Sequence, residues 1–233
     1  MIEPLFQAKI TCVCCDSPYL SSRIRPSFKK AIRTDTDFCM WYKEEVNPEY
    51  YVVRVCPMCG FSSTENAMQR LSERQKSFYY SKLGNSWLPR DYGGERTWEQ
   101  AMESYKLALL CAQAVGEKDR VIAGLLHHIA WLYRYKDNKE QELRFLRFAL
   151  EAYIKVYETE GESLNSARLM FLLGELHKRV DEPYEAVKWF ARVVNDKRIT
   201  DAGMIRASRE QWQNLREDML AKKMELPEEV EEA

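Results

Sequence analysis

The chain has 233 residues, and its 35 lysines and arginines nearly balance its 36 aspartates and glutamates, so that the net charge is -1. This length suffices for one large domain or two small ones. The balanced charge argues against a strong attraction of the whole molecule to nucleic acid or anionic membrane, and no run of about 18 apolar residues predicts a membrane span. The first residues lack the basic and apolar regions of a signal peptide, so we expect a cytoplasmic protein in a reducing compartment.

Six of the seven cysteines precede residue 60, and four of these form two CxxC pairs. Two residues between paired cysteines let both sulfurs turn towards one point, and two such pairs supply the tetrahedral four-cysteine site that Zn²⁺ prefers. Asp16 and Gly60, which follow the pairs, tolerate the positive φ that such turns often need. The sequence predicts a structural zinc ion bound by Cys12, Cys15, Cys56 and Cys59; a redox-active dithiol pair is the alternative.

The remaining three cysteines lie outside this ligand set. Cys14 could replace Cys12 or Cys15 as a ligand, although adjacent cysteines chelate one ion poorly. Cys39, which lies between two large apolar residues, and Cys111, on a predicted helix, are expected to be buried apolar side chains.

The segment between the two CxxC pairs is basic, with no acidic residue between Asp16 and Asp35. A basic arm on a zinc ribbon could contact the phosphates of a nucleic acid. An ordinary solvated surface is the simpler interpretation, because the chain as a whole is not basic. The candidate nucleic-acid-binding residues are Arg23, Arg25, Lys29, Lys30 and Arg33.

Residues 1–61 are predicted to form a β-rich, zinc-ribbon-like module. The run Tyr50–Val55 is β-branched and aromatic, and we expect a strand there. Ser62 and Glu65 match a capping box, which predicts the start of a helix, and a stretch rich in glycine follows. We therefore assign residues 62–95 to a connecting helix and linker.

From residue 96 the apolar pattern is helical almost to the end. Capping signals at Thr97 and Asn138, and Pro183 at a first helical position, mark helix starts. The fold class is thus mostly α, with a helical domain over residues 96–223 and an acidic tail over residues 224–233. The predicted helices span residues 97–115, 118–136, 139–160, 163–180, 183–195 and 201–223.

Small and large residues recur in this domain at the offsets of tetratricopeptide (TPR) repeats. The small residues Gly174 and Ala130 lie 44 positions apart in the sequence, more than the usual spacing of about 34, so we expect a degenerate, TPR-like array of antiparallel helices. A generic helical bundle is the alternative. The matching positions are Leu173, Gly174, His177, Ala186, Phe190 and Val193; Ile129, Ala130, Tyr133, Leu146 and Ala149; and Ala101, Tyr105 and Ala108.

If the repeats stack in this way, the first helix of each pair lines a concave face. That face is aromatic with an excess of basic residues, which suits a peptide with acidic groups. The alternative is that the aromatic residues belong to the core and the charged residues to a solvated face. The predicted partner-binding residues are His127, Trp131, Arg134, Tyr135, Arg168, Phe171, Glu175, Lys178 and Arg179.

Several motifs form a pattern: Ile10-Thr11-Cys12-x-x-Cys15, Arg33-x-Asp35-x-Asp37-Phe38, Asn47-Pro48-x-Tyr50-Tyr51, Val55-Cys56-Pro57-x-Cys59-Gly60-Phe61 and the stretch Ala207–Trp212. This pattern resembles an uncharacterised bacterial family, domain-of-unknown-function family 2225, over nearly the whole chain. The resemblance implies a bacterial, cytoplasmic protein with a zinc-ribbon-like start and TPR-like helices, and it implies no activity. The adjacent Cys14 and Cys15 depart from the family's usual first pair.

The sequence predicts a protein without enzymatic activity. His127 and His128 are neighbours on different sides of a helix, and His177 falls at a packing position, so the three histidines form no chelating set. The sequence contains no phosphate-loop or dinucleotide motif, and a four-cysteine zinc ion has no open position for a substrate. We expect a zinc-binding scaffold or adaptor for a protein or peptide partner; the alternatives are a nucleic-acid-binding zinc-ribbon protein and a thiol/zinc redox-responsive regulator.

Overall fold

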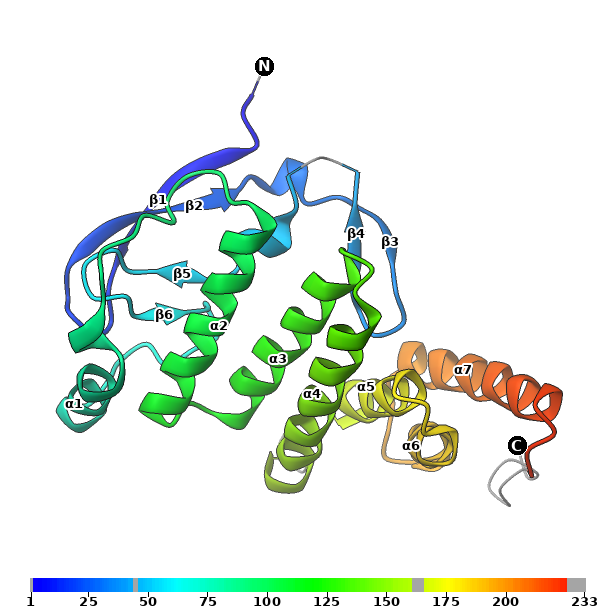
Figure 1. The fold of residues 1–233 in the computed structure, drawn as a ribbon. Coiled ribbons are helices and arrows are strands. Elements are labelled where there is room, and N and C mark those ends of the chain that lie inside the picture. Colours follow the sequence, from blue (N-terminus) through cyan, green and yellow to red (C-terminus); the bar gives the residue numbers. More distant parts are fainter. Residues whose placement is uncertain (1, 44–45, 161–165, 226–233) are drawn as a thin grey trace. The chain divides into compact units, whose positions relative to one another are not determined.

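The computed structural model describes residues 2–43, 46–160 and 166–225 (Figure 1). The chain forms two compact units, Met1–Phe145 and Leu146–Ala233. The units divide the chain differently from the predicted domains, because the cysteine-bearing hairpins and the first two long helices share one unit. The predicted acidic tail lies almost entirely outside the described residues.

Three short antiparallel hairpins form the β-structure of the first unit. β1 (Leu5–Thr11) pairs with β2 (Pro18–Ile24), β3 (Ala31–Thr34) with β4 (Met40–Tyr42), and β5 (Arg54–Val55) with β6 (Ser62–Ser63). The register of the first hairpin places Thr11 opposite Pro18, and that of the third places Val55 opposite Ser62. Each of these two hairpins therefore encloses one CxxC pair in its turn.

The strand predicted over Tyr50–Val55 is wrong for most of its length. A 3₁₀ helix covers Pro48–Tyr51, and only Arg54–Val55 forms a strand. Asn47 is responsible, because its side chain caps the 3₁₀ helix by accepting a hydrogen bond from the Glu49 amide at 2.9 Å. Buried Arg96 then holds the turn by donating to the carbonyls of Tyr50 and Val53.

The helix predicted to start at Ser62 is also wrong. Ser62 lies in β6, and its hydroxyl donates to the Gly60 carbonyl at 3.0 Å. Helix α1 (Glu73–Lys82) begins later, at a capping box that Ser72 forms with Gln75. Both serines offer the same local signal, and the cross-strand pairing of Ser62 with Val55 decides against a helix there.

The long helices agree closely with the prediction. They are α2 (Trp98–Val115), α3 (Asp119–Arg134), α4 (Lys139–Glu160), α5 (Ser166–Arg179), α6 (Pro183–Asn195) and α7 (Ala202–Ala221). Thr97 forms the expected capping box with Gln100, and Gly116 ends α2 with a φ of 63°. The predicted start of the fourth helix, residues 163–165, lies outside the described residues.

The core of the first unit lies where α2 meets α3 and the β5–β6 hairpin, as Figure 1 shows. Tyr105 and Ile129 are fully buried there, together with Val53. The hairpin is thus packed directly onto the helices. Its cysteine-bearing turn belongs to a second apolar cluster, in which Cys56 and Cys59 pack with Tyr79 of α1.

The second unit is built on the antiparallel pair α5 and α6, against which α7 packs. A Cβ atom on Gly174 would come within 2.6 Å of the Phe190 ring, so this position requires glycine for the two helices to approach closely. Tyr157 of α4 meets Trp189 of α6 edge to face, with ring centroids 4.9 Å apart. This unit therefore has its own apolar core.

Candidate metal centre

The two CxxC pairs lie in turns of the same construction. In the first, the Cys12 amide donates to the Ser17 carbonyl and the Asp16 amide donates to the Cys12 carbonyl, both at 3.0 Å. In the second, the Cys56 amide donates to the Phe61 carbonyl at 3.0 Å and the Gly60 amide donates to the Cys56 carbonyl at 2.8 Å. The residue after each pair has a positive φ, 60° at Asp16 and 76° at Gly60, as the sequence predicts.

The turns bring four thiols together. The Sγ atoms of Cys12, Cys15, Cys56 and Cys59 all lie within 4.8 Å of one another. Across the two turns, the Cys12 and Cys59 sulfurs are 3.6 Å apart and those of Cys15 and Cys56 are 3.7 Å apart. Four thiolates about 2.3 Å from a central ion lie about 3.8 Å from one another, so the cluster has the dimensions of a tetrahedral metal site.

The thiols of the cluster do not titrate independently. The hydrogen bond from Cys12 lowers the pKa of Cys56, and the hydrogen bonds with Cys12 and Cys14 raise that of Cys59. A metal cation at the centre would replace the shared protons, because cysteine binds metals as the thiolate.

The neighbouring protein encloses the cluster. Cys12, Cys56 and Cys59 are buried, and only Cys15 is partly exposed. The hydroxyl of Tyr79 in α1 donates to the Cys59 carbonyl at 2.5 Å. The indole of Trp87, which follows α1, donates to the Pro57 carbonyl at 3.0 Å. The cluster can hold a metal ion away from solvent.

Comparison with known protein families gives a match that includes both the cysteine cluster and most of the helices. The sequence profile of a family described as an uncharacterized protein conserved in bacteria (DUF2225) matches residues 5–215. The chain belongs to the DUF2225 family. No curated protein matches this chain, and no solved structure matches it either.

The cysteines outside the cluster of this DUF2225 chain have other contacts. The Cys14 amide lies 3.4 Å from the Cys12 sulfur, while the Cys14 sulfur is not among the four clustered atoms. Cys39 and Cys111 are buried, as predicted; the Cys39 thiol donates to the Tyr135 hydroxyl at 3.6 Å, and the Cys111 sulfur accepts from the Ser62 amide at 3.4 Å.

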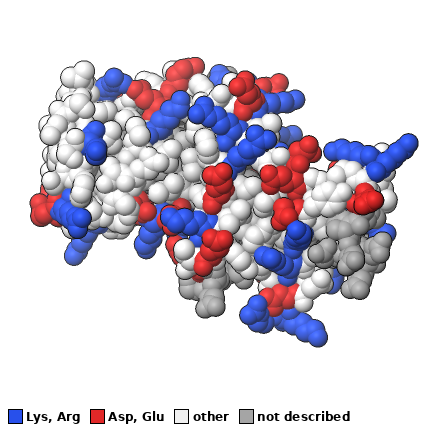
Figure 2. All heavy atoms as spheres, turned by 60° about the horizontal axis from the view of Figure 1, so that its bottom comes forward, with Lys and Arg blue, Asp and Glu red and all other residues white. Residues whose placement is uncertain are grey.

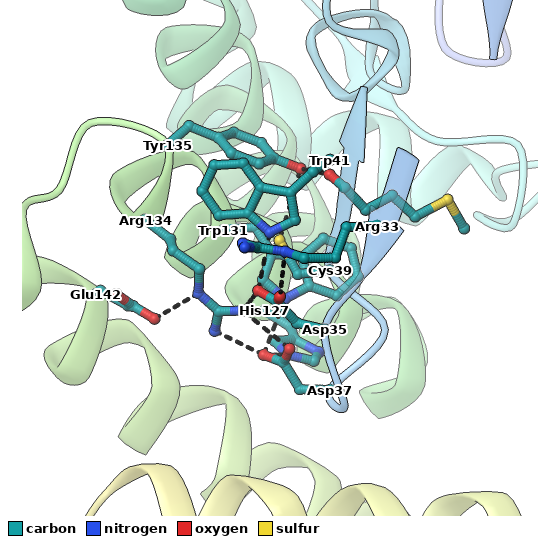
Figure 3. A network of polar contacts seen from close by, with 11 residues as sticks. Arg33, Asp35, Asp37, Cys39, Trp41, His127, Trp131, Arg134, Tyr135 and Glu142 are labelled. Carbon is teal, nitrogen blue, oxygen red and sulfur yellow. Dashed lines mark hydrogen bonds and ion pairs between the residues drawn. The ribbon is translucent and has the colours of Figure 1, made fainter. Parts of the chain in front are cut away.

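A buried ion network occupies part of the predicted partner-binding face (Figure 3). Arg134 donates to both carboxylate oxygens of Asp37, at 2.9 and 2.7 Å, to Asp35 at 3.0 Å and to Glu142 at 2.6 Å. His127 Nε2 and Trp131 Nε1 each lie 3.3 Å from Asp37 Oδ2. The segment Arg33–Phe38 thus supplies two of the three carboxylates that Arg134 contacts.

The prediction that α3 presents an open binding face is therefore wrong. The β3–β4 hairpin covers His127, Trp131 and Arg134, and Tyr135 donates to the Met40 carbonyl at 2.7 Å. The physical reason is the attraction of Arg134 to Asp37, whose side chain is fully buried. In the sequence, Asp35 and Asp37 stood out only as parts of the family motif. The two aspartates at alternate positions were the one local sign that this segment binds a cation.

On α5, the predicted face is divided between core and surface. Phe171 and Glu175 are buried, whereas Arg168 is exposed and Arg179 is partly buried. Lys178 donates to Gln211 of α7 at 2.6 Å. Only part of the predicted set is thus exposed to a partner.

The basic segment of this DUF2225 chain is largely paired with acidic or aromatic neighbours. Arg23 forms an ion pair with Glu65, and Arg33 lies 3.2 Å from Asp35 and over the Trp41 ring. Arg25 donates to the Glu3 carbonyl, while Lys29 and Lys30 are exposed. The face in Figure 2 shows basic and acidic side chains interspersed, without one large basic patch.

None of the described helices has both the length and the apolar character that crossing a bilayer requires.

Proposed function

We propose that this chain is a non-catalytic, cytoplasmic zinc-binding scaffold that presents helices to a protein or peptide partner. The observation that supports it best is that four cysteine sulfurs, which come from two separate turns, lie within 4.8 Å of one another. Zn²⁺ is the ion that such all-cysteine, tetrahedral sites usually hold. When bound, it would link residues 12–15 to residues 56–59 and stabilise the first unit.

The closed character of the cluster supports a structural role for this metal. Four thiolates complete the coordination of zinc and leave no position for a substrate or an activated water. Three of the four cysteines are buried, and the second turn is fixed by hydrogen bonds from Tyr79 of α1 and from Trp87. We therefore expect removal of the metal to act through stability.

The α5–α6 pair supports a TPR-like surface in the second unit. Gly174 packs against Phe190 as the small and large positions of such a repeat require. Because α3 is covered, we place the partner on α5, near Arg168 and Arg179. An acidic peptide is the partner whose charge fits these residues.

The metal is tested by elemental analysis of the purified full-length chain and of single Cys→Ser variants. We expect one zinc ion per chain, with loss of zinc in the Cys12, Cys15, Cys56 and Cys59 variants. Cys14→Ser is the matched control, since Cys14 is buried beside the cluster without joining it, and this variant should retain zinc. A metal-free chain whose thiols oxidise reversibly would instead favour the redox-responsive alternative.

The partner surface is tested with a library of acidic peptides and fluorescence anisotropy. We expect saturable binding that Arg168→Ala weakens. Arg216→Ala, which removes the same charge at an exposed position of α7, should leave binding unchanged. Equal effects of both substitutions would count against this surface. Tighter, salt-dependent binding of an oligonucleotide, abolished by Lys29→Ala with Lys30→Ala, would favour the nucleic-acid alternative.

A further inference from the structure

A cavity of about 400 Å³ lies in the first unit, away from the cysteine cluster. Its walls come from the turn after β6, which provides Thr64 and Asn66, and from the first half of α3. Val52, Val121 and Leu125 give it an apolar side. Its volume is in the range of small-molecule sites, which are apolar with a few convergent polar groups.

The polar side of this cavity is cationic. Lys118 and Arg120 line it at the start of α3, and no described residue of its lining carries a carboxylate. No side chain among the described residues caps this helix, and Asp119 in its first turn offsets part of the positive end of the helix dipole. The two cations of the lining therefore favour an anion in the cavity.

A smaller adjoining cavity, of about 160 Å³, extends the positive region. It shares Val52, Thr64 and Asn66 with the larger one and adds Arg23, Lys29 and Arg54 to its lining. Glu65 is the acidic residue of the described lining, and it forms ion pairs with both arginines. The two arginines thus share one carboxylate, which leaves a positive excess beside the larger cavity.

His128 contributes an oriented ring to the larger cavity. Its Nδ1 atom lies 2.9 Å from Glu49 Oε2 and 3.2 Å from the Tyr105 hydroxyl. Burial raises the pKa of Glu49, but His128, the Tyr42 hydrogen bond and the charge of Lys29 together lower it overall, so this carboxylate stays ionised. With the Nδ1 proton facing this carboxylate, Nε2 has no partner among the described residues, and it donates to a ligand when the ring is in the imidazolium form.

Gly124, near the middle of α3, has no packing reason to be glycine. A Cβ atom there would have nothing within 4 Å among the described residues, in contrast to Gly60, Gly84 and Gly174, where it would meet an aromatic ring. Glycine within a helix costs about 1 kcal/mol relative to alanine. Gly124 lines the cavity, and its missing side chain leaves that space open.

We propose that this cavity binds the phosphate group of a small organic phosphate, with the organic part against Val52, Val121 and Leu125. A phosphate monoester carries up to two charges and three acceptor oxygens, which Lys118, Arg120 and His128 can share. A carboxylate has fewer acceptors for so many donors. This inference is independent of the zinc site and of the proposed partner surface.

The test uses the full-length protein with phenyl phosphate, inorganic phosphate and phenol as probes. The chain has only three histidines, so imidazole resonances in NMR spectra report on His128 individually. We expect a saturable shift of the His128 signal with both phosphates, tighter binding of phenyl phosphate, and no shift with phenol. Absence of a saturable His128 shift, or an equal response to phenol, would overturn the proposal.

Matched variants separate a built site from nonspecific attraction. Lys118→Ala and Arg120→Ala should each weaken phenyl phosphate binding about tenfold, because each removes a charge-assisted hydrogen bond. Lys106→Ala, which removes an exposed cation on α2, should leave binding unchanged. Gly124→Leu should abolish binding while the melting temperature stays at or above that of the native chain; unaltered binding in this variant would contradict the proposal.

Discussion

At the scale of single residues, Gly60 shows how closely the second cysteine turn is built. Its φ of 76° favours glycine, and a Cβ atom would overlap the indole ring of Trp87. That ring is fixed by its hydrogen bond to the Pro57 carbonyl within the same turn. Backbone strain and a steric clash therefore act together at one position.

We expect Gly60→Ala to lower the free energy of unfolding by about 2–4 kcal/mol, from backbone strain plus overpacking. Gly116→Ala is the matched control, since Gly116 has a φ of 63° and no described atom within 4 Å of its Cβ position; it should cost about 1 kcal/mol. Urea denaturation of both variants measures the difference. Equal losses in the free energy of unfolding would show that the Trp87 ring can move aside at little cost.

The pair of Asp37 and Arg134 carries a second residue-scale prediction. Removing one partner of a buried ion pair leaves the other charge uncompensated, which costs about 3–5 kcal/mol. We expect Asp37→Ala to lower the free energy of unfolding by about that amount. Arg33→Ala breaks the exposed pair with Asp35, where the Arg33 side chain is 62% exposed, and should cost at most about 1 kcal/mol; a similar loss in both variants would refute the distinction.

His127 adds a pH dependence to the same network. Burial lowers its pKa from the ordinary value of 6.5, against the opposing effect of Asp37, and the nearby charges of His128 and Arg134 act in the same direction as burial. A histidine with a lower pKa in the folded chain stabilises the fold above its unfolded pKa, and this contribution is lost as the pH falls towards the folded value.

We therefore expect the free energy of unfolding to decrease on acidification from about pH 7.5 to about pH 5.5, and His127→Gln to reduce that slope. Urea titrations across this range provide the measurement. Acid-driven release of metal affects both proteins alike, so the difference between their slopes isolates His127. Identical slopes would mean that His127 keeps one protonation state throughout.

At the scale of elements, α1 connects the cysteine cluster to α2. Tyr79 contacts the second cysteine turn, and Gln75 donates to the Val115 carbonyl at 2.8 Å. The same Gln75 completes the capping box with Ser72. The start of this short helix and its attachment to α2 thus depend on one side chain and its capping partner.

Ser72→Ala should destabilise α1 by about 1 kcal/mol, because it removes the cap of a helix with few turns. Hydrogen exchange of the α1 amides should accelerate accordingly. Ser81→Ala is the matched control, since Ser81 lies near the other end of α1 and bonds only to the Phe78 carbonyl within the helix. Unchanged exchange in Ser72→Ala would show that packing alone holds α1.

The long helices were predictable because their signals are local. Caps at Thr97 and a proline at 183 lie within a few residues of the structure they specify. The four-cysteine cluster was predictable for a related reason, since each pair is a local turn. By contrast, Asp37 meets Arg134 across 97 positions of sequence, and no local pattern could show that the β3–β4 hairpin covers α3. The cavity beside His128 depends on such distant contacts as well.

At the scale of the whole molecule, each unit has a core of its own. The first unit contains the cysteine cluster and the packed pair α2 and α3, and the second contains Gly174 and Phe190. A metal bound by the cluster would link two hairpins that both belong to the first unit. Its contribution to stability should accordingly be confined to that unit.

Chelation of the metal should increase hydrogen exchange in β1, β2, β5, β6 and α1, while α5, α6 and α7 keep their protection. Hydrogen exchange with mass spectrometry resolves these segments. The exchange rate of the amides in the cysteine-bearing turns should increase more than about tenfold, because removing a structural zinc ion costs several kcal/mol. Equal loss of protection in both units would indicate that they unfold as one.

The separation of the two CxxC pairs has a consequence for synthesis of the chain. Cys15 precedes its neighbour in the cluster, Cys56, by 41 positions. At a translation rate of about 5–20 residues per second, the first pair waits roughly 2–8 s for the second to follow it from the ribosome. During that interval the nascent chain offers the thiols of Cys12, Cys14, Cys15 and Cys39 to any soft metal ion or oxidant. The first half of the proposed metal site is therefore exposed to the metal ions of the cell before the complete four-cysteine cluster exists.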